Sequence, residues 1–380
     1  MSKSLPLLAL ASLVLVALSG CAPARTDAVF HAETNPAELS AWGVFDAADG
    51  ALVLSDGVIP YDLNSPLFTD YAHKLRTLWV PPGAPAVDLN AGGVPDFPVG
   101  TVISKTFYYP RTAAEVSDVL KADDPVGRLN PILEDLDQVR LMETRLLVRR
   151  DAGWDAVSYV WNEDQSDAVL TRIGDAQPLT LADEQGTEQD FTYIVPDINQ
   201  CSGCHAPNNT TRKIEPLGLR ARHLNKDYVH EYGSVNQVAY LQARNVLTEP
   251  DTVHEVPANV DWTNDALPLE ARARSYLDIN CSHCHNPVGP ADTSGLDLTR
   301  EAEPGPALGI CKLPIAAGSG TGGRTFSIVP QAPDASILLY RLETTQPGAM
   351  MPELGRALHH AEGAALIRRW IAEMEGDCAS

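Results

Sequence analysis

Alternating apolar and polar residues in the first half of the chain are typical of β-strands. From about residue 28 to residue 195, short runs of strand-forming residues are separated by turns rich in Gly and Pro. Residues 144–150 and 154–162 form two such runs, and the Asp-Ala-Gly sequence at 151–153 predicts a hairpin loop between them. Residues 101–109 predict a further strand. We therefore expect a β-rich, sandwich-like domain in this half.

From about residue 190, apolar residues recur at helical spacing instead. One apolar stripe covers 269–280 and follows Pro268, a residue type that favours the first turn of a helix. A second stripe covers 366–374, and residues 236–247 predict a further helix. The predicted fold class is thus multidomain, with the β-rich domain followed by mainly α-helical domains.

The N-terminus has the features of an export signal. An apolar run over 5–18 follows Lys3 and is too short for a comfortable membrane-spanning helix. It ends in Leu-Ser-Gly-Cys at 18–21, which resembles the lipobox of bacterial lipoproteins, and the resemblance implies that Cys21 is lipidated. The alternative is an ordinary signal peptide. Because Ala22 is not Asp, the resemblance implies an outer-membrane anchor, with the protein facing the periplasm or the cell surface.

Composition and charge exclude some classes of partner. The 380 residues include 50 acidic and 28 basic side chains, which give a formal net charge of −22. Nucleic-acid binding needs clustered Lys and Arg, so we expect no nucleic-acid partner. The charge instead favours basic protein partners.

Four of the seven cysteines form two copies of one motif, Cys-x-x-Cys-His, at 201–205 and 281–285. This spacing is the signature of c-type haem attachment: two thiols one helical turn apart reach the two vinyl groups of a porphyrin, and the next histidine binds the iron. The sequence therefore predicts two covalently bound haem c groups, one on Cys201 and Cys204 and one on Cys281 and Cys284.

Three other interpretations of the cysteine pairs are a zinc site, a thioredoxin-like redox pair and ordinary disulfides. The two pairs are too far apart in the sequence for a zinc ribbon, and neither has the βαβ context of a thioredoxin-like pair. Disulfides would leave the histidine after each pair as a coincidence. The remaining cysteines near the C-terminus, Cys311 and Cys378, could form a disulfide in an oxidising compartment, the alternative being two free thiols.

The haem motifs give the chain a resemblance to known families. Residues 268–380 resemble a class I cytochrome c domain, and the whole chain resembles a family of secreted dihaem c-type cytochromes with a Leu-Asn-Ser-Pro-Leu-Phe-like segment, here 63–68. The expected organisation has four parts: a signal peptide (1–21), a β-rich domain of unknown role (22–190), a first haem region (191–265) and a second, cytochrome c-like domain (266–380).

Axial iron ligands follow from the motifs and from the resemblance. His205 and His285 are the expected proximal ligands. The Met-Met-Pro segment resembles the methionine loop of cytochromes c, which implies that Met351, or Met350 after a shift by one residue, is the second ligand of the second haem. The sequence does not assign a sixth ligand to the first haem. The residues to be considered are His223, His230, His254, Met142, His73 and Lys105.

The predicted function is electron transfer by a dihaem c-type cytochrome in the bacterial cell envelope. Redox proteins are the expected donor and acceptor, and a lipid anchor holds the protein at the membrane. One alternative is a peroxidase-like enzyme with an open first haem, and another is an electron-accepting subunit of a separate dehydrogenase. No catalytic residues are predicted.

Overall fold

A computed structural model of the protein describes residues 27–89, 93–111, 115–125, 127–248, 256–315 and 317–378. The predicted signal peptide over 1–21, including Cys21, lies outside these residues. In the described part of the chain, no helix is both long enough and apolar enough to cross a membrane.

The largest element is a six-stranded antiparallel sheet with the strand order β3-β4-β5-β7-β8-β9. Its strands are β3 (Ile59–Tyr61), β4 (His73–Trp79), β5 (Val102–Pro110), β7 (Val139–Arg150), β8 (Gly153–Trp161) and β9 (Ala168–Thr171). Strand β5 is the strand predicted over 101–109, and β7 and β8 form the hairpin predicted around 151–153. In β5 every residue is buried except Lys105, so both faces of this strand are covered.

Three smaller sheets complete the β structure. A three-stranded sheet has the order β11-β10-β6, and two pairs of strands, β1-β2 and β12-β13, stand apart from it. Their bounds are β1 (Phe45–Asp46), β2 (Val53–Leu54), β6 (Asp118–Leu120), β10 (Asp175–Ala182), β11 (Glu188–Val195), β12 (Asp227–His230) and β13 (Gly233–Asn236). Strand β11 ends just before the first cysteine pair, so this sheet directs the chain into the first motif.

The helices are short. The α-helices are α1 (Cys201–His205), α2 (Ala221–Leu224), α3 (Gln237–Ala243), α4 (Leu269–Cys281), α5 (Ile337–Glu343) and α6 (Ala361–Glu373). The 3-10 turns include η1 (Leu39–Trp42), η2 (Ala48–Gly50), η3 (Pro131–Glu134), η4 (Leu136–Gln138), η5 (Leu217–Leu219), η7 (Asp292–Ser294), η8 (Gly318–Thr321) and η9 (Pro333–Ala335). Helices α4 and α6 coincide with the two predicted apolar stripes, and α3 covers only the first part of the helix predicted over 236–247.

The predicted fold class is wrong. Strands account for 26% of the described residues and helices for 22%, and this part of the chain contains several sheets and only six short α-helices. The regions expected to be mainly α-helical therefore consist mostly of loops, with β12 and β13 inserted among them. The physical reason is the frequency of Pro and Gly after residue 285, where residues 286–315 and 317–336 hold a succession of turns between α4 and α5.

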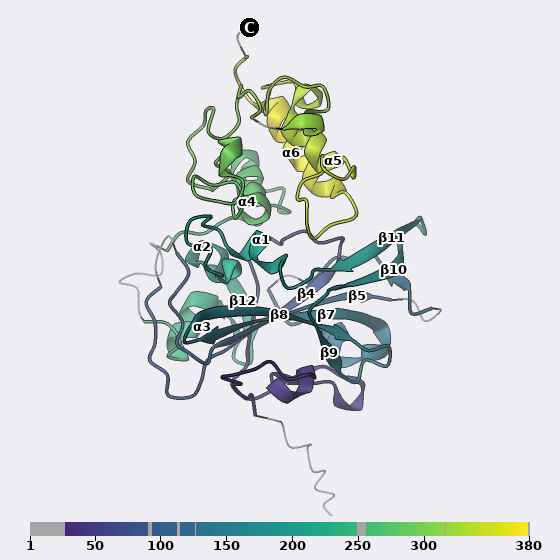
Figure 1. The fold of residues 1–380 in the computed structure, drawn as a ribbon, viewed down its shortest axis with the longest axis vertical. Helices are drawn as coiled ribbons and strands as arrows, with labels where there is room; N and C mark the ends of the chain where they lie inside the picture. The colour runs from purple at the N-terminus through teal and green to yellow at the C-terminus, as the bar shows by residue number, and fades with distance from the viewer. Residues whose placement is uncertain are drawn as a thin grey trace, which may run out of the picture.

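Two hydrophobic cores lie on opposite faces of the large sheet. One packs the sheet against N-terminal residues such as Leu39 and Trp42. The other packs it against the segment that follows the first motif, with Leu219 and Leu224 beside Ile103 of β5. Figure 1 shows α1 and α2 above the strands of this sheet, between it and the C-terminal helices. The first motif is thus held directly against the β-rich part of the molecule.

The C-terminal helices have a core of their own. Helices α4, α5 and α6 surround residues that include Leu277, Ile367 and Trp370. Tyr276 of α4 lies against Gly363 of α6, where a Cβ atom would be only 2.3 Å from the tyrosine hydroxyl oxygen. The close crossing of α4 and α6 therefore requires glycine at this position, because any side chain would push the two helices apart.

Candidate functional site

The first Cys-x-x-Cys-His motif forms helix α1, a single helical turn. This conformation puts Cys201, Cys204 and His205 on one face of the turn. His205 Nδ1 lies 2.9 Å from the carbonyl oxygen of Glu215 and must donate to it, because a carbonyl only accepts. The proton is therefore on Nδ1, and Nε2 keeps a free lone pair. Burial, followed by the charge of Lys105, lowers the pKa of His205 to about 3, so the ring is neutral.

The second motif begins at the last residue of helix α4 and continues its turn. The backbone N–H groups of Cys284 and His285 both donate to the carbonyl oxygen of Cys281. His285 Nδ1 lies 3.1 Å from the hydroxyl oxygen of Ser294, and that hydroxyl donates its own proton to Ala291. The hydroxyl therefore accepts from His285 Nδ1, and Nε2 is again left with its lone pair.

The His285 ring is also kept neutral. Burial, assisted by the charge of Arg341, lowers the pKa of His285 to about 4. Both motif histidines thus have the same tautomer and the same charge. A histidine that binds a metal commonly donates its other ring N–H to a neighbouring oxygen, as both do here.

The two motifs lie in direct contact although they are far apart in the sequence. The thiol of Cys284 donates to the carbonyl oxygen of Gly203, with an Sγ–O distance of 3.4 Å. Beyond the motifs, Asn286 Nδ2 donates to the carbonyl oxygen of Pro207 at 3.2 Å, and Asn209 N–H donates to Val288 at 2.7 Å. Groups attached to the two motifs would therefore be neighbours.

The six cysteines of the described residues fall into two chemical groups. The four motif cysteines are free thiols, and burial raises the pKa of each, to about 12 for Cys281 and Cys284. The other two, Cys311 and Cys378, are joined by a disulfide. Within the described residues, no group of three or more His, Cys, Asp and Glu side chains is placed to hold a bare metal ion. The cysteine pairs are thus reduced, separate pairs that do not converge on one metal site.

A buried ion pair holds the surroundings of the two motifs together. Asp278 of α4 accepts two hydrogen bonds from Arg222 of α2, at 2.7 and 3.0 Å, and a third from Asn259 at 2.8 Å. Burial alone would raise the pKa of Asp278, but these hydrogen bonds and the positive charge hold it well below its usual range. Helix α4 is thereby fixed to the segment that follows the first motif.

The methionines differ in their environments. Met142 is completely buried in a hydrophobic core of the β-rich part, and Met374 packs against the C-terminal core. Met350 and Met351 are half-buried and belong to none of the hydrophobic cores of the described residues. The loop that carries them reaches the first motif, since Leu354 Cδ1 would lie 3.2 Å from a Cβ atom at Gly203.

The histidines considered as sixth ligands of the first haem have other partners. His73 Nε2 lies 2.8 Å from the carbonyl oxygen of Ala122, and its Nδ1 lies 3.5 Å from Asp124. His223 is buried beside Asp278, with 3.8 Å between Nε2 and a carboxylate oxygen. His230 is stacked on Tyr240 with ring centroids 3.6 Å apart. The remaining candidate, His254, lies outside the described residues.

One residue near the first motif was missed by the sequence reasoning. His283 stands between the two cysteines of the second motif, and helical geometry turns it away from Cys281, Cys284 and His285. Burial, His285 and Lys105 together lower the pKa of His283 to about 4. Its ring makes no hydrogen bond with the residues that the structure describes. The signal available in the sequence was a second histidine inside the motif itself.

The donor set fits haem attachment. Each motif offers two reduced thiols at helical spacing and an imidazole whose Nε2 is free, which are the groups that two thioether bonds and one axial bond to iron require. A methionine loop lies close to both motifs: Leu354 contacts Gly203, and the charge of Glu353 acts on Cys284. Comparison of the chain with protein-family models, with curated proteins and with solved structures found no match.

Proposed function

We propose that this chain is a dihaem c-type cytochrome that transfers electrons in the bacterial cell envelope. The observation that supports it most is the pair of Cys-x-x-Cys-His segments. Each forms a helical turn with free thiols and a neutral histidine held through Nδ1, at 201–205 and 281–285. Two haem groups would be attached to these cysteines, with His205 and His285 as proximal ligands.

A covalently bound haem supplies one-electron redox chemistry at its iron. The chain orients each histidine with a single oxygen, the Glu215 carbonyl for His205 and the Ser294 hydroxyl for His285. We propose Met351 as the second axial ligand of the second haem, since its side chain is not engaged in any described hydrophobic core. A His/Met pair leaves no position for a substrate and raises the reduction potential, as suits an electron carrier.

The contact between the motifs would allow electrons to pass between the two haems of the proposed carrier. Because the Cys284 thiol touches Gly203 of the first motif, the two segments that would hold the haems lie side by side. An electron received by one haem could then pass to the other within the same molecule. The formal charge of −22 would attract a redox partner with a basic surface, in an association that weakens with salt.

The cellular location is part of the proposal. Haem c is attached outside the bacterial cytoplasm, and a lipid on Cys21 would tether the protein to the membrane. The disulfide between Cys311 and Cys378 agrees with an oxidising compartment.

A peroxidase-like enzyme is the second candidate function. It is favoured by the first site, where the structure engages His73 and His223 in other contacts and buries Met142 in a core. An iron with no sixth ligand there would bind peroxide. Catalysis would also require a polar side chain on the open side of that haem, and the sequence places none there by a recognisable motif.

A redox titration distinguishes the two candidates. For the carrier we expect the full-length protein to take up two electrons per chain reversibly, with low-spin spectra at both haems. The carrier would be contradicted by a stable high-spin haem that binds cyanide and consumes peroxide with turnover. Titration of the Cys311→Ser/Cys378→Ser variant serves as the control, because this change removes a cysteine pair that lies outside both motifs.

A further inference from the structure

Three cations stand side by side on the large sheet. In the strand register, Arg76 of β4 is opposite Lys105 of β5, and Lys105 is opposite Arg145 of β7. Directly opposed residues on neighbouring antiparallel strands have Cβ atoms about 5 Å apart, and like charges at such positions repel each other. We call Arg76, Lys105 and Arg145 the cationic row.

The cationic row faces the first motif. Side chains two residues apart on a strand share a face, so Lys105 shares its face with Ile103, and Arg145 shares its face with Leu147. Both of these neighbours belong to the core that contains Leu219, from the segment just after the motif. In keeping with this placement, the charges of Lys105 and Arg145 both act on Cys204 and His205.

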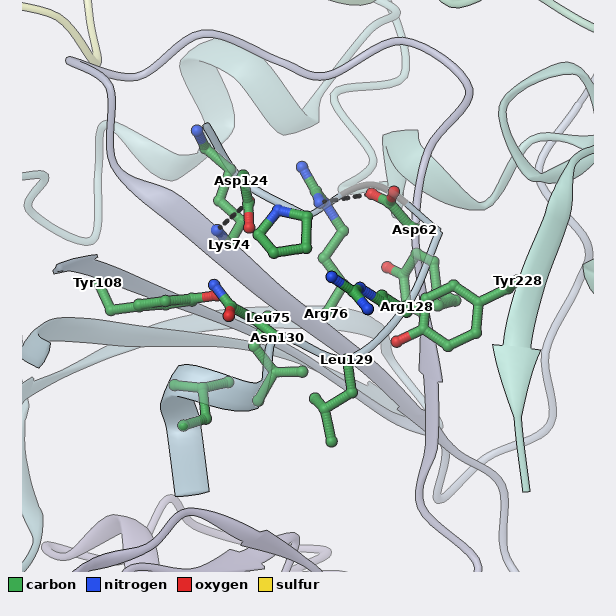
Figure 2. A pocket seen from close by; sticks show the side chains of 13 residues that line it. Asp62, Lys74, Leu75, Arg76, Tyr108, Asp124, Arg128, Leu129, Asn130 and Tyr228 are labelled. Carbon is green, nitrogen blue, oxygen red and sulfur yellow. Dashed lines mark hydrogen bonds and ion pairs between the residues drawn. The ribbon is translucent and has the colours of Figure 1, made fainter. Parts of the chain in front are cut away.

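Only the two ends of the row have carboxylate partners. Arg145 Nε donates to Glu143 at 2.8 Å, and Arg76 lies 3.3 Å from Asp62. Asp62 is shared, because Lys226 also donates to it at 2.9 Å. Figure 2 shows the Arg76 end, where dashed lines join Arg76 to Asp62 and Lys74 to Asp124 around a small pocket.

Lys105, at the centre, has no such partner. Its Nζ lies 5.0 Å from the ring centroid of Phe107, and no hydrogen bond or ion pair joins it to any residue of the described ranges. Lys105 is half-buried and its neighbours across both strand pairs are cations. Burial and the neighbouring charges of Arg145 and Arg76 lower the pKa of Lys105 to about 7, so its charged form is costly in this place unless an anion binds beside it.

We propose that the cationic row is a carboxylate-binding site that holds the propionate groups of the haem attached to Cys201 and Cys204. The inference rests on the proposed function and adds a role for the β-rich part of the molecule. A haem carries two propionates, and Arg and Lys side chains bind carboxylates through charge-assisted hydrogen bonds. Binding of the propionates would stabilise the charged form of Lys105.

Removal of the Lys105 charge tests the proposal. We would compare Lys105→Met and Lys105→Gln with Lys105→Arg, which keeps the charge, and with Lys213→Met, which removes an exposed charge near the same motif. The measurements are the two midpoint potentials, the propionate bending bands in resonance Raman spectra, and the spin state by EPR, all on full-length protein loaded with haem.

We expect both uncharged variants to retain two haems and their spin state, to shift the propionate bands, and to lower the potential of one haem. The potential falls because a nearby positive charge favours the reduced iron. Lys105→Arg and Lys213→Met should resemble the parent protein. Lys105→Gln is included because an effect that both uncharged variants share cannot come from the packing of the methionine side chain.

Other outcomes overturn the inference in distinguishable ways. Unchanged potentials and Raman bands in both uncharged variants would show that the row does not bind the propionates. A new high-spin signal in both would show that Lys105 ligates the iron instead. A parent protein without haem would refute the proposed function and the inference together, whereas a failed inference with both haems present leaves the proposed function intact.

Discussion

The Sγ atom of Cys284 lies 3.4 Å from the carbonyl oxygen of Gly203, so the second Cys-x-x-Cys-His motif touches the first. Residues separated by about 80 positions in the chain are thereby brought to one place. Arg222 of α2 and Asp278 of α4 support this contact, because their ion pair fixes α4 to the segment that follows the first motif. If both motifs carry haem, the two groups form one redox unit.

If both haems are bound, the reduction potential of each should depend on whether the other is oxidised or reduced. We expect reduction of one haem to lower the reduction potential of the other, because the added electron makes its surroundings more negative. A Cys281→Ala/Cys284→Ala variant, which keeps only the first motif, should titrate as a single one-electron step. The coupling is disproved if the first haem shows the same potential in this variant as in the parent protein at every stage of its titration.

The assignment of Met351 predicts a specific loss. Met351→Ala should abolish the sulfur-to-iron charge-transfer band of the oxidised protein and lower the potential of the second haem, because the thioether ligand raises it. Met350→Ala is the matched control and should retain the band. The reverse result, with the band lost only in Met350→Ala, would move the ligand to Met350.

Asp278 should contribute strongly to stability. Asp278→Asn leaves the buried guanidinium of Arg222 without its counter-charge, and removal of one partner of a buried ion pair costs about 3–5 kcal/mol. Equilibrium unfolding in denaturant measures the loss. Asp261→Asn, at a half-buried carboxylate whose hydrogen bonds stay within its own turn, is the control and should change the free energy of unfolding little.

The same carboxylate predicts a pH dependence. Because the pKa of Asp278 is lower in the folded protein than in the unfolded chain, its stabilising contribution is complete above the unfolded value, about 4. It should decline as the pH falls below that value. The difference in stability between the parent protein and Asp278→Asn should therefore shrink on acidification, and a constant difference from pH 7 down to pH values of about 3 would contradict the assignment.

The C-terminal disulfide should stabilise the fold without affecting haem content. Cys311 and Cys378 are separated by 67 residues, and a bond that closes a loop of this length contributes about 4 kcal/mol in the chain-entropy model. Cys311→Ser/Cys378→Ser should unfold at lower denaturant concentration and still bind two haems. Equal stability of this variant and the parent protein would show that the bond contributes nothing.

The regular elements were accessible from the sequence where periodicity was strong. The strand over 101–109, the hairpin at 151–153 and the stripes of α4 and α6 all appear in the structure because one residue pattern determines each. The prediction of mainly helical haem domains failed because it extended the helical pattern of α4 and α6 over the intervening residues. Those residues are rich in Gly and Pro, which favour turns.

The site was only partly predictable. The motifs identify Cys201, Cys204 and His205 by local spacing, but the contact between the two motifs depends on tertiary packing that no local pattern encodes. The cationic row illustrates the same limit. Lys105 is visible as a single charge in an apolar strand, whereas its register beside Arg76 and Arg145 follows only from the pairing of β4, β5 and β7.

The haem content of the mature protein decides whether the chain is a dihaem cytochrome. Protein purified from a host that attaches haem c would be measured by intact mass and by the pyridine haemochrome spectrum. We expect two haems per chain, one of which is lost in Cys201→Ala/Cys204→Ala and the other in Cys281→Ala/Cys284→Ala. Colourless protein whose mass equals that of the polypeptide and its lipid would contradict it.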